Sequence, residues 1–440
     1  MHSQHQNFID TQLAIAYNAD KVRTFNNAFR ESGKDIRMSD NLEKVLGSTI
    51  PSFISRLMQD AATYVAEKVG TTTVQMPTFF VELADTLKRL AEQARHNRNG
   101  GLTLVPMPGF VELASTTKKL IEEHEKDTPV DIVVPEFNTR SNKEPVVRLS
   151  KDHIGGHDCV ILTSGPGTYE MLTQLQLALG YLVGRRAARI SIVTGYLPLG
   201  RSDKDEGALE FALASHIVHM IVSASYGHLD RIIAPDLHAP QVVMAAQVGL
   251  ITEVTLARRV LTRAVSDALE KFKRICLVLP DDGAYKKFMR VIAEVEKNLN
   301  IKLPVVCGQK RRNSDTHSEL LGLAGDTSAL KDALAIGFDD EIATGITTVH
   351  TAEAVLRQYD AADYWAAAIH GVLCGDAPKI LSSELCPITR VFITDSIPPN
   401  GRIELDPLRA SDRLKVVSWD EDLAHLIYYH HWDKSIREMR

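Results

Sequence analysis

Two acidic residues and a hydroxyl-rich loop stand side by side in the last third of the chain. Asp339 and Asp340 end an apolar run, and Thr344, Gly345 and Thr347 follow shortly before a helical pattern begins. Backbone N–H groups and hydroxyls at a helix N-terminus suit a phosphate group. Carboxylates at a strand end suit sugar hydroxyls or, through water, a divalent cation. The stretch therefore suits a ribose phosphate, although an ordinary acidic strand-to-helix turn has the same composition.

This stretch resembles the phosphoribosyl-diphosphate loop of type I phosphoribosyltransferases and of ribose-phosphate diphosphokinases. Their pattern is two acids, two variable residues and then Asp-Thr-Gly-Gly-Thr. The positions that match are Asp339, Asp340, Thr344, Gly345 and Thr347. The resemblance implies that this loop holds the ribose phosphate. The loop includes Ala343, which differs from the family pattern.

Two positions depart from the family pattern. Ala343 stands where a third acid is usual, and Ile346 stands where a second Gly is usual. Losing a charged hydrogen-bonding group costs ~1.5–3 kcal/mol, unless a neighbour such as Glu341 compensates. A β-branched residue is also unfavourable wherever a loop needs positive φ. These departures keep open a different ribosyl acceptor, such as ADP-ribose.

A second polar segment follows the apolar run 190–194. It contains Pro198 and Gly200, which stop regular structure, and then two cations and two acids. Arg and Lys on a strand-end loop suit a polyphosphate, and a solvated charged turn is the plain alternative. The segment resembles the ATP-binding segment of ribose-phosphate diphosphokinases. The resemblance implies ATP contacts from Arg201, Ser202, Asp203 and Lys204.

Two further strand ends carry candidate magnesium ligands. His238 follows Asp236 and Leu237 after one apolar run, and Asp281 follows another. A His at such a place is more often structural than catalytic. The family resemblance implies that His238 and Asp281 bind the Mg²⁺ that bridges the nucleotide phosphates. Because Mg²⁺ prefers oxygen ligands, the imidazole's role follows from the resemblance alone.

Three consecutive cations, residues 310–312, follow the apolar run 305–307. A polar loop of this kind is commonly a solvated patch. The family has Lys-Arg-Arg here on a mobile flap over the triphosphate, which implies that Lys310 and Arg312 stabilise the transferred phosphoryl group. Losing one such cation typically costs ~3 kcal/mol of barrier. Phe137 and Glu144 resemble, at a longer spacing, an adenine-binding segment that reaches a neighbouring subunit.

The elements that must position these residues alternate from residue 101 onward. Short apolar runs, which predict strands, are separated by helical patterns such as 169–183, 256–272 and 283–298. This alternation predicts open, mostly parallel sheets with ligands at the carboxyl ends of the strands. The prediction is an α/β protein with two tandem type I phosphoribosyltransferase-like domains. Its predicted parts are a helical N-terminal extension (1–100), an ATP-side domain (101–254) and a ribose 5-phosphate-side domain (255–440).

Composition excludes several classes of protein. The net charge of −6 gives no reason to expect nucleic-acid binding. Five cysteines without C-x-x-C spacing indicate reduced thiols in a cytoplasmic protein rather than a disulfide scaffold or a zinc site. No apolar run approaches the ~18 residues that a membrane helix needs. The first residues, MHSQHQNFID, lack the basic and apolar regions of a signal peptide.

Together the motifs imply a ribose-phosphate diphosphokinase. Such an enzyme transfers the diphosphoryl group of Mg-ATP to the 1-hydroxyl of ribose 5-phosphate and releases AMP. The family also implies a homo-oligomer with shared active sites. The alternatives are a diphosphokinase with another acceptor and a non-catalytic relative. A non-catalytic relative would not need the magnesium and phosphate ligands of the motifs, and their presence argues against it. A plain phosphoribosyltransferase would not need a second, nucleotide-binding domain.

Overall fold

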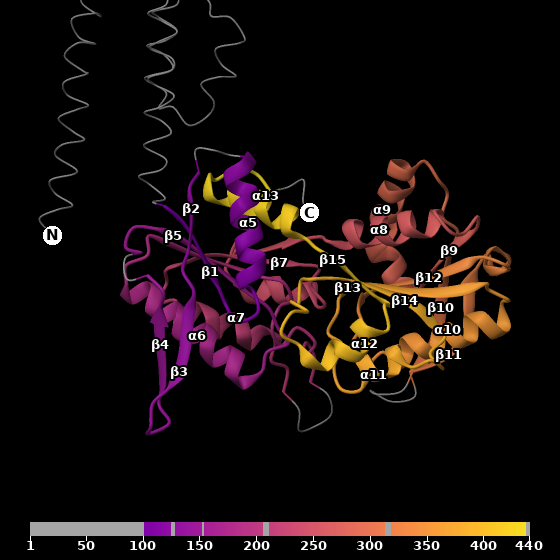
Figure 1. Ribbon diagram of the computed structural model, residues 1–440, viewed down its shortest axis with the longest axis horizontal. Coiled ribbons are helices and arrows are strands. Elements are labelled where there is room, and N and C mark those ends of the chain that lie inside the picture. Colours follow the sequence, from indigo (N-terminus) through magenta and orange to yellow (C-terminus); the bar gives the residue numbers. More distant parts are fainter. Residues whose placement is uncertain (1–100, 125–127, 152–153, 206–210, 313–317, 437–440) are drawn as a thin grey trace, which may run out of the picture. The chain divides into compact units, whose positions relative to one another are not determined.

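The computed structural model describes residues 101–440 except for 125–127, 152–153, 206–210, 313–317 and 437–440. The predicted helical extension, 1–100, lies outside the described residues. Asn99–Arg440 form one compact unit. Figure 1 confirms the predicted α/β class, because helices cover both faces of two sheets. The boundary between the two predicted domains at residues 254 and 255 stays a prediction.

The first sheet contains six strands, all parallel, in the order β2-β1-β5-β6-β7-β8. Its central strands are buried along their whole length, as both faces of a parallel sheet must be when helices cover them. The strands are β2 (Val130–Ile132), β1 (Leu102–Pro106), β5 (Asp158–Thr163), β6 (Arg189–Thr194), β7 (Leu229–Pro235) and β8 (Ile251–Val254).

The second sheet contains seven strands in the order β11-β10-β9-β12-β13-β14-β15. Only the β10–β11 pair is antiparallel. The strands are β11 (Ser318–Gly325), β10 (Val305–Arg312), β9 (Ile275–Leu279), β12 (Leu334–Glu341), β13 (Asp363–His370), β14 (Ile388–Thr394) and β15 (Leu414–Val417). A separate antiparallel hairpin consists of β3 (Pro135–Thr139) and β4 (Pro145–Leu149).

Helices bury the apolar faces of both sheets in three cores. One core runs through both sheets beneath α5 (Val111–His124), α8 (Ala257–Leu269), α9 (Asp282–Leu299) and α13 (Asp420–His431). The opposite face of the first sheet packs against α6 (Tyr169–Gly184) and α7 (Ala214–Ala224). The opposite face of the second sheet packs against α10 (Ile346–Gln358), α11 (Ala377–Ser382) and α12 (Asp406–Ala410).

Helix α9 shows how the sequence dictates one of these elements. Asp281 has extended backbone and its Oδ1 accepts a hydrogen bond from the N–H of Ala284, which caps the helix. Asn300 ends the helix in the left-handed conformation, which Asn tolerates better than most residues. The buried residues recur at helical spacing between these ends. They are Phe288, Val291, Ile292 and Val295.

The C-terminal helix α13 returns from the second sheet to the first, where it packs against α5. His431 Nδ1 lies 2.7 Å from Oδ2 of the fully buried Asp158, and the guanidinium of Arg189 donates to the same oxygen. Burial alone would raise the pKa of Asp158, but His431 and Arg189 outweigh burial and lower it. A paired, ionised carboxylate therefore fixes α13 to the amino end of β5.

One predicted loop has a different structure. The cations at 310–312 do not form a polar loop after a short strand, because β10 continues to Arg312. The added residues pair with β11, and Lys310 lies opposite Leu320 in the register. Antiparallel pairing satisfies backbone groups that a loop would leave to water. The prediction of a loop at this position was therefore wrong.

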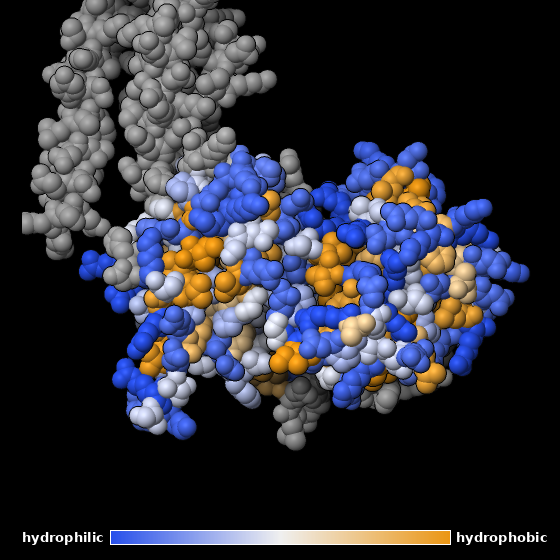
Figure 2. Space-filling view, viewed as in Figure 1, coloured by the Kyte–Doolittle hydropathy of each residue, from blue (hydrophilic) through white to orange (hydrophobic). Residues whose placement is uncertain are grey.

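The face seen in Figure 2 mixes hydrophilic and hydrophobic side chains, and the hydrophilic ones predominate. Single exposed apolar residues such as Met289 are ordinary on a protein surface. Among the described residues, no helix has both the length and the apolar character that crossing a membrane requires.

Candidate active site

The ends of β7 and β12 bring an imidazole and a carboxylate together. His238 follows β7 in the first sheet, and Asp340 lies near the end of β12 in the second. His238 Nδ1 is 3.3 Å from Asp340 Oδ2. The hydrogen bond to Asp340 raises the pKa of His238, against the effect of burial. The contact therefore places the end of β12 in the second sheet next to the segment that follows β7 in the first.

Lys287 of α9 completes this cluster. Its Nζ lies 3.3 Å from Asp340 Oδ2 and donates to the carbonyl oxygen of Leu237 at 3.4 Å. Burial alone would raise the pKa of Asp340, but the hydrogen bond from His238 and the charge of Lys287 lower it well below its usual range. Asp340 therefore stays ionised. The backbone N–H of Asp340 also donates to Oδ1 of the neighbouring Asp339.

The backbone that presents His238 is strained and tightly held. Asp236 has a φ of 41°, which is unusual for a non-glycine residue. Its carboxylate accepts hydrogen bonds from the N–H of Leu256 and the hydroxyl of Thr255. Its carbonyl oxygen lies 3.3 Å from His370 Nε2, which must therefore carry a proton and donate. Burial lowers the pKa of His370 to about 4, so this imidazole is neutral at pH 7.

The predicted phosphate loop leads into a helix at a glycine with positive φ. Gly345 has a φ of 74° and immediately precedes α10. Because glycine has no side-chain oxygen, it cannot cap the helix through a side chain. The side chains of Thr344 and Thr347 are exposed at the start of this helix, where the first backbone N–H groups of a helix have no partner within it. Ile346 is not among the residues with positive φ, and its side chain is 46% exposed. Its β-branch therefore does not strain the loop.

Ala343 occupies an apolar environment rather than a polar gap. It packs against a small cluster formed by Tyr196, Val372 and Ile397. Tyr196 comes from the first sheet, whereas the other members follow strands of the second. At this position an apolar contact between the two halves stands where the family pattern has an acid.

The predicted ATP segment contacts the end of β12, and we call the space bounded by this segment, His238 and the end of β12 the cleft. Arg201 Nη1 lies 3.1 Å from Oε1 of Glu341, the last residue of β12. Asp203 accepts a hydrogen bond from the side-chain amide of Gln241 at 2.9 Å. Ser202 Oγ accepts from the N–H of Leu213 and so braces the start of α7. Arg201 therefore joins this segment to the end of β12.

The other predicted residues lie at neighbouring strand ends or elsewhere. Asp281 is exposed at the N-terminus of α9, where its Oδ1 caps the helix. Lys310 and Arg312 lie in β10, two strands from β12, and their side chains lie outside the described residues. Phe137 packs against the core of the first sheet, and Glu144 lies in the turn of the β3–β4 hairpin. This hairpin is on the side of the first sheet away from the second (Figure 1).

The candidate ligands at these strand ends fit a magnesium ion that takes its remaining ligands from the substrate and from water. Among the described residues, no set of three or more His, Cys, Asp or Glu side chains could hold a metal ion. Mg²⁺ commonly takes one or two protein groups and fills its remaining positions with phosphate oxygens and water. His238 and Asp281, each exposed at a strand end, match that pattern.

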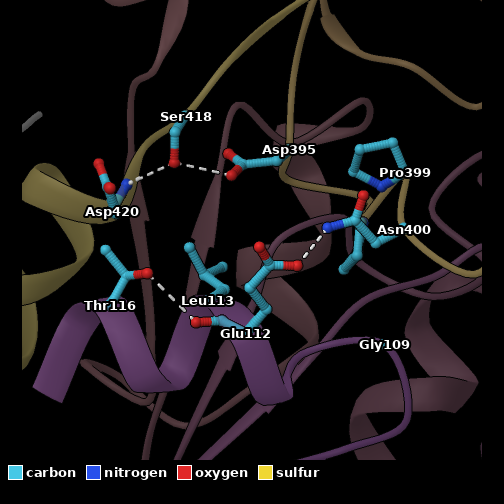
Figure 3. A pocket seen from close by; sticks show the side chains of 10 residues that line it. Gly109, Glu112, Leu113, Thr116, Asp395, Pro399, Asn400, Ser418 and Asp420 are labelled. Atoms are coloured by element: carbon cyan, nitrogen blue, oxygen red, sulfur yellow. Dashed lines mark hydrogen bonds between the residues drawn. The ribbon is translucent and has the colours of Figure 1, made fainter. Parts of the chain in front are cut away.

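A separate pocket of about 280 Å³ lies between the start of α5 and the segments that follow β14 and β15 (Figure 3). Glu112, Asp395 and Asp420 give it an acidic lining. In Figure 3, Asn400 donates to Glu112, and Ser418 donates to Asp395. None of the cleft residues described above lines this pocket, so it is distinct from the candidate active site.

Sequence reasoning missed Lys287 and the connections of Glu341 and His370. Lys287 lies inside an amphipathic helix beside another lysine, and neither spacing nor residue type distinguishes it. His370 ends β13, and its contact with Asp236 joins residues 134 positions apart. Such pairings depend on how the two sheets dock, which no local pattern reports.

No protein-family model matches the sequence. The chain is similar to curated enzymes named ribose-phosphate pyrophosphokinase. One from Caldanaerobacter subterraneus subsp. tengcongensis is 30% identical over 274 residues, which cover 62% of this chain and 81% of the relative. Another, from Lactococcus lactis, is 26% identical and covers 69% and 85%, respectively. A crystal structure of phosphoribosylpyrophosphate synthetase from Mycobacterium smegmatis has a TM-score of 0.61 at 24% identity, covering 76% of this chain and 99% of that one.

Proposed function

The chain belongs to the ribose-phosphate pyrophosphokinase family, and we propose that it transfers the diphosphoryl group of Mg-ATP to the 1-hydroxyl of ribose 5-phosphate. The products are phosphoribosyl diphosphate and AMP. The contact between His238 and Asp340 is the observation that supports this most directly. It joins the predicted nucleotide side to the predicted sugar side within one hydrogen-bond length, as a direct transfer between two bound substrates requires.

In this proposal the sugar phosphate is held by the end of β12 and the start of α10. Asp339 and Asp340 accept hydrogen bonds from the ribose hydroxyls, and Thr344, Gly345 and Thr347 bind the 5-phosphate. The hydrogen bond from His238 and the charge of Lys287 keep Asp340 ionised, so that its carboxylate acts only as an acceptor. The same contacts aim the 1-hydroxyl at the nucleotide.

The nucleotide is held on the first sheet. Arg201, Ser202, Asp203 and Lys204 position its phosphates. When bound, Mg²⁺ supplies positive charge to the phosphates, and His238 and Asp281 are the residues that would hold it. Lys310 and Arg312 stabilise the charge that develops on the phosphoryl oxygens. Positioning and electrostatic stabilisation carry such a transfer, and no protein nucleophile is needed.

The comparisons favour ribose 5-phosphate as the acceptor over ADP-ribose, because the relatives carry the name ribose-phosphate pyrophosphokinase. The apolar surroundings of Ala343 and the helical start at Ile346 are compatible with this acceptor. Release of AMP from Mg-ATP in the presence of either acceptor separates the alternatives. We expect rapid release with ribose 5-phosphate and only background release with ADP-ribose. The reverse result would establish another acceptor, and no release with either would indicate a non-catalytic relative.

The proposal extends to a cytoplasmic homo-oligomer that completes its nucleotide site with Phe137 and Glu144 of a neighbouring subunit. All five cysteines are free thiols, which fits a reducing compartment. The β3–β4 hairpin that carries Phe137 and Glu144 lies on the side of the first sheet away from the second (Figure 1), which fits a contribution to another subunit. Light scattering of the full chain tests this point, and a monomeric mass would contradict it.

A further inference from the structure

The carboxylate of Glu341 joins the two halves of the cleft at a place that the family motif does not specify. Oε2 accepts a hydrogen bond from the Tyr196 hydroxyl at 2.8 Å, and Oε1 lies 3.1 Å from Arg201 Nη1. Both partners lie in the segment after β6 of the first sheet, whereas Glu341 ends β12 of the second. The Glu341 side chain is only 8% exposed. Its two oxygens therefore have defined partners rather than solvent.

Neighbouring residues on a strand point in opposite directions, so Asp340 and Glu341 reach different loops. Asp340 contacts His238 after β7, and Glu341 contacts Arg201 after β6. The end of β12 is thus attached twice to the nucleotide side. The residues that immediately follow form the loop to which we assign the ribose phosphate.

Tyr196 holds Glu341 in one orientation. Its side chain is 4% exposed, and its ring packs edge-on against His370 with the ring centroids 5.0 Å apart. Gly165 lies so close that a Cβ there would come within 2.7 Å of the Tyr196 ring. The ring therefore cannot shift without moving the backbone around it. A phenol fixed in this way sets the plane of the Glu341 carboxylate and directs its second oxygen at Arg201.

The guanidinium of Arg201 is paired through one nitrogen, and much of the side chain is exposed. Its side chain is 59% exposed, although Nη1 is paired with Glu341. A guanidinium has five N–H donors, so most of them remain available to a phosphate in the cleft. An exposed arginine loses considerable side-chain entropy when a ligand fixes it, and an existing contact reduces that loss.

We infer that Glu341 is a positioning residue that presents Arg201 to the nucleotide phosphates and links nucleotide binding to the sugar-phosphate loop. This inference rests on the proposed function for the identity of the ligands. It assigns to Glu341 a role on the nucleotide side, although its sequence neighbours serve the sugar side.

The first test compares Glu341→Gln with the wild-type full chain in steady-state kinetics. Gln keeps the shape and an acceptor for Tyr196 but removes the charge that holds Arg201. We expect the KM for ATP to rise about tenfold, as is typical for loss of a charge-assisted hydrogen bond, with kcat changed less than about threefold. An unchanged or lower KM for ATP would overturn the inference. Glu421→Gln, which removes the charge from an exposed ion pair with Arg259 that includes none of the proposed ligand-binding residues, is the matched control.

A double-mutant cycle separates positioning from a general structural role. Binding of a nonhydrolysable ATP analogue is measured by calorimetry for Arg201→Ala, Glu341→Gln and the double variant. If Glu341 acts through Arg201, Glu341→Gln weakens binding in the wild-type background and changes it less than about twofold in the Arg201→Ala background. Equal weakening in both backgrounds would overturn the inference. Because no turnover is needed, the result is distinguishable from a failure of the proposed reaction.

Discussion

His238 Nδ1 and Asp340 Oδ2 lie 3.3 Å apart, although one residue follows a strand of the first sheet and the other ends a strand of the second. Parallel sheets bind ligands beyond the carboxyl ends of their strands. Two such edges that face each other at hydrogen-bond distance can hold two substrates in contact. The proposed transfer depends on this arrangement.

Lys287 is the cation next to this pair, with its Nζ 3.3 Å from Asp340 Oδ2. The hydrogen bond from His238 and the charge of Lys287 both lower the pKa of Asp340. Replacing Lys287 with Met removes the second of these, so the carboxylate binds sugar hydroxyls less well. We expect Lys287→Met to lower kcat/KM for ribose 5-phosphate by tenfold or more, the usual cost of a charged contact in a site. Lys286→Met is the control, because Lys286 pairs with Asp282 on the exposed side of the same helix. Equal effects of the two substitutions would argue against a role for Lys287.

Arg402 shapes the loop that supports the phosphate site. Its guanidinium donates to the carbonyl oxygens of Gly371, Val372 and Leu373. The same loop then donates from the N–H of Leu373 to Ile342, next to the phosphate loop. We expect Arg402→Met to raise the KM for ribose 5-phosphate about five- to tenfold while the KM for ATP changes less than twofold.

Arg413 provides the control for this experiment. It donates to three backbone carbonyls between α11 and β14 in the same manner but lies away from the cleft. Arg413→Met should destabilise the fold without a selective change in either KM. A change in both KM values after Arg402→Met would show a general loss of structure instead.

Gly195, directly after β6, packs closely against the backbone that follows β14. A Cβ at this position would lie 1.8 Å from the carbonyl oxygen of Ser396, which belongs to the second half. Gly195→Ala must therefore push the halves apart, and we expect it to lower the free energy of unfolding by about 2 kcal/mol or more. Urea unfolding measures this change.

Gly180→Ala is the matched substitution, because a Cβ at Gly180 of α6 meets no atom within 4 Å. Ala favours helices over Gly by about 1 kcal/mol, so this variant should be as stable as the wild type or slightly more stable. If Gly195→Ala behaves in the same way, the tight contact between the halves is absent in solution.

His430 makes stability depend on pH. Burial, followed by the charge of Arg189, lowers the pKa of His430 to about 4, while Asp158 and Asp230 act in the opposite direction and Arg231 adds to the lowering. The unfolded chain binds a proton near pH 6.5, whereas the folded protein does so only near pH 4. Stability from His430 is therefore complete above pH 6.5 and is lost as the pH falls toward 4. The loss amounts to about 3 kcal/mol at most.

The variant His430→Gln removes this titration and can keep a hydrogen bond with Ser191, which lies 2.7 Å from the imidazole. Urea unfolding between pH 7 and pH 4 should give a shallower decline for the variant than for the wild type. His425→Gln, on the exposed side of the same helix, should leave the slope unchanged. Parallel slopes for the wild type and His430→Gln would exclude this contribution of His430.

The strand ends of the cleft were predictable because each apolar run stops at polar residues. Asp340, His238 and Arg201 all follow this rule, and alternating strands and helices imply that such ends share an edge. Lys287 was not predictable, since Lys286 beside it has the same type and the same helical context. Only the packing of α9 against β12 shows that Lys287, and not Lys286, lies next to Asp340.

Long-range pairing explains the other differences. The continuation of β10 to Arg312 depends on β11, which supplies the partner strand for a sequence that favours a loop by composition. The return of α13 to the first sheet depends on the buried contact between His431 and Asp158, which lie 273 residues apart. Neither partner is evident until the fold brings the segments together.

Phosphorus NMR of the full chain with Mg-ATP and ribose 5-phosphate tests the central claim most directly. The proposed transfer predicts that the three resonances of ATP disappear while AMP and a sugar-linked diphosphate appear in equal amounts. Formation of ADP would contradict it, because the enzyme would then transfer a single phosphoryl group. Unchanged ATP in the presence of ribose 5-phosphate would contradict it equally.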